Sequence, residues 1–195
     1  VVIACNTLTV LGVDTLKGSH AFEIVGMSKG AQLVLAASSR KKIGVFATEF
    51  TINSGAHKAA ILAADDGADV YPQACPKFVP LIEGEQFDGA EVRAAVAEYA
   101  APLKAAGIDT LILSCTHYPF IQKEIESEFG SEVTVIDPAD ATAQDTKTVL
   151  AAEGLLRSEG AGTLEVCFTA DVERGARIAG RVLPQGKCLF KEIKL

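Results

Sequence analysis

Eight short apolar runs alternate with segments of helical spacing along this 195-residue chain. Each run has the length and residue types of a β-strand: Val1–Ala4, Phe22–Val25, Ile43–Ala47, Val70–Ala74, Thr110–Ser114, Val133–Ile136, Leu164–Thr169 and Lys187–Phe190. Strands that alternate with helices are typical of βαβ units, in which neighbouring strands run parallel. The pattern predicts an α/β protein with mainly parallel sheets, arranged as one wide sheet or two narrower ones.

The clearest predicted helix spans Ala90–Ala106, with Gly107 as its C-terminal cap. Its apolar stripe recurs at steps of three and four residues and consists of Val92, Val96, Tyr99 and Leu103. The segments Ser54–Asp66 and Ala139–Glu153 are predicted as two further helices, each ending at a glycine.

Two of the predicted strands end in the same way, with a cysteine followed by polar or titratable residues. The two sets are Cys5, Asn6 and Thr7, and Cys115, Thr116 and His117. In an open α/β sheet, the groups just past the carboxyl ends of the strands line the ligand crevice. Two thiols placed there can flank one substrate carbon, so that one removes a proton and the other returns one to the opposite face. Taken singly, each cysteine also fits a buried core position.

The residues beside each cysteine fit this chemistry. Asn6 and Thr7 offer hydrogen bonds and can cap a helix that follows Cys5. The N-terminus of such a helix lowers the pKa of a thiol and attracts a carboxylate. His117 is interpreted either as a group that binds substrate and shuttles a proton to the Cys115 thiol, or as a structural loop residue. Pro119 permits a helix to begin just after it.

Glu83 closes an apolar segment whose backbone is fixed by Pro76 and Pro80. The sequence leaves two interpretations of this carboxylate open. In one, Glu83 is a charge partner for His117 or for a substrate ammonium group, and in the other it is a surface residue.

Thr48 and Thr51 follow the Ile43–Ala47 run, where their hydroxyls can bind a substrate carboxylate or cap a helix. A metal site is not predicted, because Cys115 and His117 have no matching second pair of ligands. The remaining cysteines are interpreted as core or loop residues: Cys75, Cys167 and Cys188.

Composition argues against several classes of partner. The net charge is −7, aromatic residues make up 6%, and Arg40, Lys41 and Lys42 form the only basic cluster, so nucleic acid is not an expected partner. The chain has no uninterrupted apolar run of about 18 residues, as a membrane-spanning helix requires. Five cysteines without disulfide-scaffold spacing indicate free thiols and a cytoplasmic location. Glycine motifs for nucleotide binding are missing.

Three segments together resemble glutamate racemases, the cofactor-independent enzymes of the aspartate/glutamate racemase superfamily. They are residues 2–7, 74–81 and 109–119, within a resemblance that extends over essentially the whole chain. The Cys-Asn-Thr string also suits aspartate and hydantoin racemases, whereas Cys-Thr-His-Tyr-Pro is more specific to the glutamate branch. Ser114 departs from the usual glycine, as does Ala170 between Thr169 and Asp171.

The resemblance implies two flavodoxin-like lobes with the active site between them. The first lobe is expected to comprise residues 1–26 and 139–195, and the second residues 27–138. The first lobe is expected to be incomplete, because the family's Asp-Ser-Gly loop and Tyr-Gly contacts would precede Val1, and the isolated chain is expected to have impaired activity. A homodimer is left open.

The resemblance also implies the chemistry. L- and D-glutamate would be interconverted by two-base proton transfer without a cofactor, in a bacterial cytoplasm, to supply D-glutamate for peptidoglycan. The acid/base residues would be Cys5 and Cys115, and the substrate-binding and supporting residues would be Asn6, Thr7, Thr116, His117, Glu83 and Thr48. The alternatives are an aspartate- or hydantoin-type racemase, a Cys–His acyl-transfer enzyme, a pyridoxal-dependent racemase and a non-catalytic amino-acid-binding domain.

Overall fold

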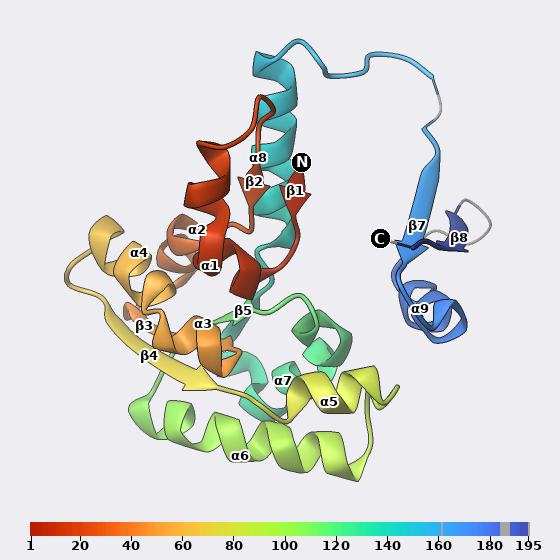
Figure 1. Ribbon diagram of the computed structural model, residues 1–195. Helices are drawn as coiled ribbons and strands as arrows, with labels where there is room; N and C mark the ends of the chain where they lie inside the picture. The colour runs from red at the N-terminus through yellow and green to blue at the C-terminus, as the bar shows by residue number, and fades with distance from the viewer. Residues whose placement is uncertain (161, 184–187, 195) are drawn as a thin grey trace. The chain divides into compact units, whose positions relative to one another are not determined.

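The computed structural model describes residues 1–160, 162–183 and 188–194, which divide into two compact units, Val1–Leu155 and Leu156–Leu195. The strands, labelled in Figure 1, are β1 (Val2–Ile3), β2 (Val25–Gly26), β3 (Lys42–Ala47), β4 (Asp69–Ala74), β5 (Thr110–Ser114), β6 (Thr134–Ile136), β7 (Leu164–Phe168) and β8 (Cys188–Glu192). The α-helices are α1 (Asn6–Lys17), α2 (Ala31–Ala37), α3 (Glu49–Asn53), α4 (Ala56–Ala64), α5 (Phe78–Glu83), α6 (Ala90–Ala106), α7 (Gln122–Phe129), α8 (Ala139–Ala152) and α9 (Val172–Ala179). Two short 3-10 helices complete the set, η1 (Tyr118–Ile121) and η2 (Gly130–Glu132).

Every strand pair in the described residues is parallel. The first unit contains a four-stranded sheet of order β4-β3-β5-β6 and a two-stranded sheet of β1 and β2, and the second unit pairs β7 with β8. The predicted α/β class with mainly parallel sheets is therefore confirmed. One strand lies later than predicted, since β2 begins at Val25 rather than Phe22. The hydroxyl of Thr9 accepts a hydrogen bond from the Met27 backbone at 2.9 Å and fixes that later position.

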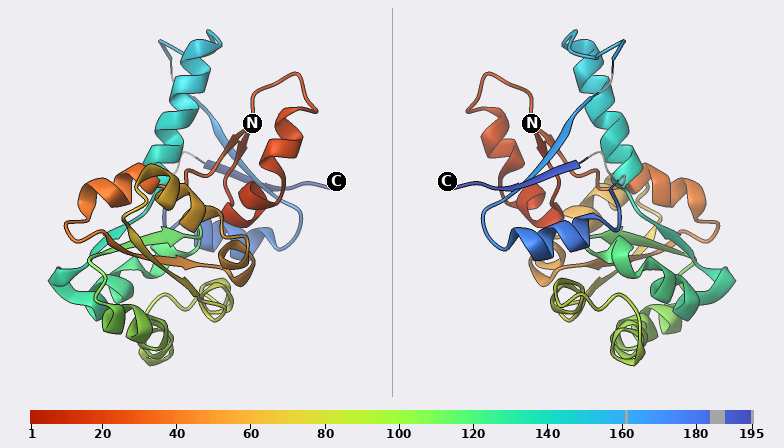
Figure 2. Two further views of the ribbon diagram at one scale, coloured as in Figure 1. Left: turned by 90° about the vertical axis from the view of Figure 1, so that its left-hand side faces the viewer. Right: turned by 90° about the vertical axis from the view of Figure 1, so that its right-hand side faces the viewer.

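The four-stranded sheet has a hydrophobic cluster on each face, and these clusters bury its two central strands, β3 and β5, almost completely. Phe46, Leu111 and Leu113 point to the side of α5, α6 and α7, whereas Val45 and Ile112 point to the side of α2 and α4. Figures 1 and 2 show α4 and α6 on opposite sides of this sheet. Such two-sided burial is typical of parallel sheets and explains why these strands read as continuous apolar runs.

The helix α6 has the predicted boundaries. It spans Ala90–Ala106 and ends at Gly107, whose φ of 71° lies in the left-handed region that favours glycine. All four residues of the predicted apolar stripe are buried: Val92, Val96, Tyr99 and Leu103. The helices α4 and α8 lie within two residues of the predicted boundaries at each end.

The second unit is a βαβ unit of β7, α9 and β8. Phe168 of β7 and Phe190 of β8 stack with ring centroids 6.3 Å apart. Gly175 of α9 lies close to this pair, since a Cβ there would be 2.4 Å from the Phe168 ring unless the ring moved. The predicted strand Lys187–Phe190 overlaps β8, which ends two residues later than predicted, at Glu192, while Lys187 lies outside the described residues. The predicted lobe boundaries (residues 1–26 with 139–195, and residues 27–138) stay a prediction.

Candidate active site

Within the first unit, polar groups gather where β1, β3 and β5 end. Cys5 follows β1, Thr48 follows β3 and Cys115 follows β5. The helices that begin beside these ends are in contact, α1 with α3, and the hydroxyls of Thr7 and Thr48 are 2.9 Å apart. Residues from separate parts of the sequence therefore meet at one edge of the sheets, as the strand-end pattern predicted.

Cys5 is half-buried and occupies the N-cap position of α1. Its backbone is extended, with φ −152° and ψ 123°, and Asn6 and Thr7 are the first two residues of the helix proper. The prediction that Asn6 and Thr7 cap this helix is therefore wrong, because a cap residue lies outside the helical backbone. The thiol, rather than the amide or the hydroxyl, stands at the start of the 12-residue helix.

Three threonine hydroxyls form a cluster where α1 and α3 begin. The Thr7 hydroxyl lies 2.9 Å from that of Thr48 and 3.2 Å from that of Thr51, and the last two are 3.0 Å apart. Thr48 also caps α3, because its hydroxyl accepts a hydrogen bond from the Thr51 backbone at 3.4 Å. Of the two open interpretations, helix capping is confirmed for Thr48, and binding of a substrate carboxylate stays a prediction.

Asn6 is 3% exposed, and its side-chain nitrogen has no hydrogen-bond partner among the described residues. An amide N–H that is buried without a partner destabilises the protein by about 1–3 kcal/mol, so such groups in native proteins usually have a reason. Because Asn6 directly follows Cys5, a bound ligand that accepts a hydrogen bond from this amide would be one such reason.

Cys115 is more deeply buried than Cys5, with 8% of its surface exposed. Burial raises the pKa of its thiol to about 11; hydrogen bonding from the His117 backbone opposes this shift, and the nearby Cys5 adds to it. The two thiols are thus close enough to interact electrostatically. At neutral pH this environment holds Cys115 in its protonated form.

His117 and Glu83 form a pair behind Cys115. The Nδ1 atom of His117 lies 3.9 Å from the Cys115 sulfur, and its Nε2 atom lies 2.7 Å from the Glu83 Oε1 atom. Of the two open interpretations of Glu83, the contact matches the one that makes it a charge partner for His117. Thr116, which lies between Cys115 and His117 in the sequence, is exposed.

A third thiol lies close to Cys115. Cys75 is fully buried in the core cluster, and burial, followed by the charge of Cys115, raises the pKa of the Cys75 thiol. Its backbone carbonyl accepts a hydrogen bond from the Tyr118 hydroxyl at 3.3 Å. The prediction of Cys75 as a core residue is confirmed, while its proximity to Cys115 was missed. Its position directly after β4 was the available signal. Of the other two cysteines, Cys167 is exposed and Cys188 is half-buried.

The described residues contain no cluster of three or more His, Cys, Asp or Glu side chains that could hold a metal ion. Within that same part of the chain, no helix is long and apolar enough to cross a membrane.

Comparisons with known proteins agree with one another. A family model described as Asp/Glu/Hydantoin racemase matches residues 1–146. Two glutamate racemases from Lysinibacillus sphaericus are 38% and 40% identical, over 100% of this chain and 74% of their own length. The crystal structure of glutamate racemase isoform RacE1 from Bacillus anthracis has 31% identity and a TM-score of 0.89, over 100% of this chain and 72% of that one.

Together with the parallel α/β fold, these comparisons place the chain in a class of α/β isomerases. The chain belongs to the glutamate racemase family, within the broader Asp/Glu/Hydantoin racemases. The glutamate racemase from Francisella tularensis, whose structure is in complex with D-glutamate, has 26% identity and a TM-score of 0.84, over 100% of this chain and 72% of that one.

Proposed function

We propose that this protein interconverts L- and D-glutamate by two-base proton transfer, without a cofactor. The observation that carries the proposal is the electrostatic interaction between Cys5 and Cys115, thiols from the ends of two separate strands. Racemisation needs one base on each face of the substrate α-carbon, and thiols suit the task because their pKa values are tuned by their surroundings. The names of the relatives supply glutamate as the substrate.

Two-base transfer requires the two thiols to start in different protonation states. In one direction, Cys5 enters as thiolate and takes the α-proton, and Cys115 enters as thiol and donates its proton to the opposite face. The burial that raises the Cys115 pKa to about 11 suits it to the role of donor. In the reverse direction the roles are exchanged, so Cys5 must carry a proton, taken from solvent or left by a preceding forward turnover, and Cys115 must first lose its proton. His117, 3.9 Å from its sulfur, accepts that proton, and Glu83, 2.7 Å away, stabilises the resulting imidazolium.

The remaining polar groups are proposed to hold the substrate. The α-proton of an amino acid is very weakly acidic, so the site must stabilise negative charge that spreads from the α-carbon to the carboxylate. Asn6, Thr7 and Thr48 supply hydrogen-bond donors beside Cys5, and Thr116 supplies one beside Cys115. The unpartnered amide nitrogen of Asn6 supports this role, because a carboxylate oxygen would satisfy it.

The proposed lobes place Cys5 and Cys115 on opposite sides of the site, since residues 1–26 belong to the first lobe and residues 27–138 to the second. The D-glutamate formed would supply peptidoglycan synthesis in a bacterial cytoplasm. The bacterial sources of the relatives support this setting.

The mechanism is tested by incubating L-glutamate with the protein in D2O and comparing Cys5→Ser, Cys115→Ser and the matched control Cys167→Ser, which alters an exposed thiol of the second unit. The unaltered protein and the control should form D-glutamate carrying deuterium at the α-carbon. Each of the other two variants should lose racemisation by about a thousandfold. Protium retained in the product, or two-way racemisation by either variant, would contradict the proposal.

A further inference from the structure

Two buried polar side chains behind the candidate active site lack partners among the described residues. His57 of α4 is 3% exposed, and neither of its ring nitrogens has a hydrogen-bond partner in that part of the chain. Ser114, the last residue of β5, is fully buried, and its hydroxyl is likewise unpartnered. Buried polar groups in native proteins are almost always satisfied by protein or by ordered water.

His57 and Ser114 face the same hydrophobic cluster. Side chains two residues apart on a strand share a face, so Ser114 points to the same side of the sheet as Ile112. On a helix, residues four apart share a face, so His57 points the same way as Ile61. Ile61 and Ile112 belong to one cluster, on the side of α2 and α4. This side is opposite to the cluster that contains Cys115.

The two residues also lie at the same end of the sheet. Ser114 pairs in register with Ala47, the last residue of β3, and the chain passes from there through α3 into α4, whose second residue is His57. Asp65, the residue after α4, forms an ion pair at 2.6 Å with Lys41, the residue before β3. The far end of α4 therefore lies at the start of β3. The helix α4 therefore runs back along the sheet, with His57 near the carboxyl ends of the strands.

A third segment covers the same corner. Gly30 packs so closely on β5 that a Cβ there would lie 2.4 Å from the Ile112 Cδ1 atom. The neighbouring Lys29 is near enough for its charge to act on His57, and burial followed by this charge lowers the His57 pKa to about 4. The imidazole is therefore neutral at neutral pH, with one donor and one acceptor nitrogen to satisfy.

We propose that one ordered water molecule bridges the His57 ring and the Ser114 hydroxyl, and that this bridge positions the end of β5 and hence the Cys115 thiol. A buried water typically makes about three hydrogen bonds to groups that would otherwise be unsatisfied. His57 and Ser114 supply two of its partners, on the side of the sheet away from the thiol. Both act as positioning residues, and the catalytic meaning of the bridge rests on the proposed racemase function.

A double-mutant cycle tests the bridge without any reference to activity. The variants are Ser114→Ala, His57→Leu and their combination, and the measurement is the unfolding equilibrium constant in urea. If one water joins the two side chains, the combined effect should differ from the product of the single effects by at least threefold. The control pair replaces Ser114→Ala by Thr110→Val, which removes another unpartnered hydroxyl from the same face at the far end of β5. In the control pair, the effect of the double variant on the unfolding constant should equal the product of the two single effects. The same result for His57 and Ser114 would overturn the proposal.

The positioning role is tested through the reactivity of Cys115. Alkylation of its peptide is followed by mass spectrometry as a function of pH, which requires no turnover, so a failure of the racemase proposal would not affect the result. Ser114→Ala and His57→Leu should each change the rate at pH 8 by at least threefold. Thr110→Val should not change it, and His57→Gln, which retains hydrogen-bonding groups, should restore it. Unchanged rates in the first two variants, an equal change in the control, or no rescue by His57→Gln would overturn the role of the bridge.

Discussion

The two proposed bases are held by regions of very different packing. Cys115 follows a strand that is buried on both faces within the four-stranded sheet, and it is itself 8% exposed. Cys5 follows β1, which among the described residues pairs only with β2, and it is half-buried. A dense core therefore sets the position and protonation of one thiol. The other depends on a strand end and the start of a helix.

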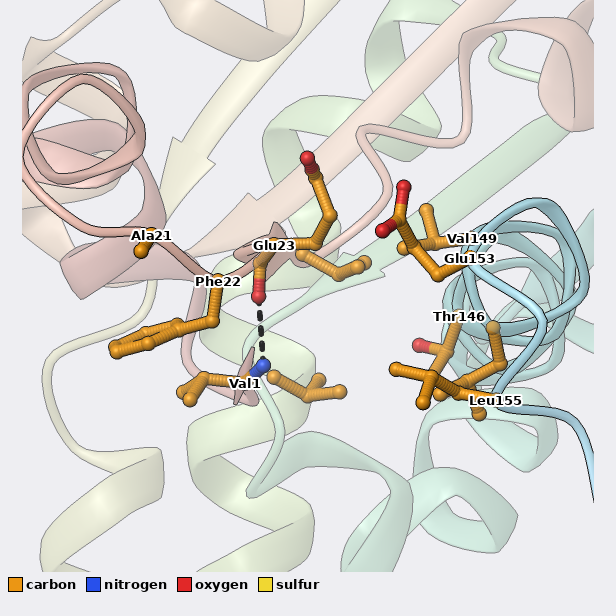
Figure 3. A pocket seen from close by; sticks show the side chains of 11 residues that line it. Val1, Ala21, Phe22, Glu23, Thr146, Val149, Glu153 and Leu155 are labelled. Atoms are coloured by element: carbon orange, nitrogen blue, oxygen red, sulfur yellow. Dashed lines mark hydrogen bonds between the residues drawn. The ribbon is translucent and has the colours of Figure 1, made fainter.

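The region around Cys5 leaves more apolar surface in contact with water. Leu8 and Leu11 of α1 are 55% and 59% exposed, and Val2 of β1 is 43% exposed. A pocket of about 250 Å³ lies between this region and α8, and neither thiol lines it. Figure 3 shows Phe22 and Val149 among its lining residues. Parallel sheets are normally covered on both faces, so the region that carries Cys5 is expected to be the less stable of the two.

The largest expected difference between the two regions is in stability. Phe78 is fully buried, with its ring 5.1 Å from that of Tyr118 and 5.2 Å from that of Tyr99. Phe78→Ala should lower the free energy of unfolding by about 3–5 kcal/mol, because it leaves a cavity in the core. Leu11→Ala should change it by less than about 0.5 kcal/mol. Urea unfolding measures both, and similar losses in the two variants would remove the proposed contrast in packing.

A somewhat smaller effect is expected from pH. The folded protein holds the pKa of His57 at about 4, below its ordinary value of 6.5, so between these values only the unfolded chain binds the proton. The free energy of unfolding should therefore fall by about 3 kcal/mol as the pH drops from 6.5 to 4. His57→Gln should flatten this part of the profile, whereas His20→Gln, at an exposed position, should not. A slope that survives in His57→Gln would exclude His57 as its source.

The smallest predicted effect compares the two thiols directly. With its pKa raised to about 11, Cys115 is ionised to about one part in a thousand at pH 8, and burial also restricts its access. Iodoacetamide should therefore alkylate Cys5 at least about tenfold faster than Cys115, and glutamate should slow both reactions. Peptide mapping by mass spectrometry separates the two rates. Equal rates would mean that the difference in packing between the two regions does not change the reactivity of the two thiols.

Local patterns predicted most of the secondary structure. Apolar periodicity gave the boundaries of α6, and continuous apolar runs gave β3 and β5 to within a residue. Errors arose where a contact from elsewhere in the chain decided the outcome. The hydroxyl of Thr9 fixes the position of β2, and the path of the chain into α1 makes Cys5, rather than a neighbouring polar residue, the N-cap.

The sequence by itself indicated which side chains stand at the ends of β1, β3 and β5, because an apolar run and the polar residues that follow it are a local pattern. Only the tertiary structure decided which of them meet. Thr7 and Thr51 are 44 residues apart in sequence, and Glu83 and His117 are 34 apart, yet each pair is within hydrogen-bonding distance. The raised pKa of Cys115 was likewise beyond the sequence, because burial and charge depend on every segment that packs around the thiol.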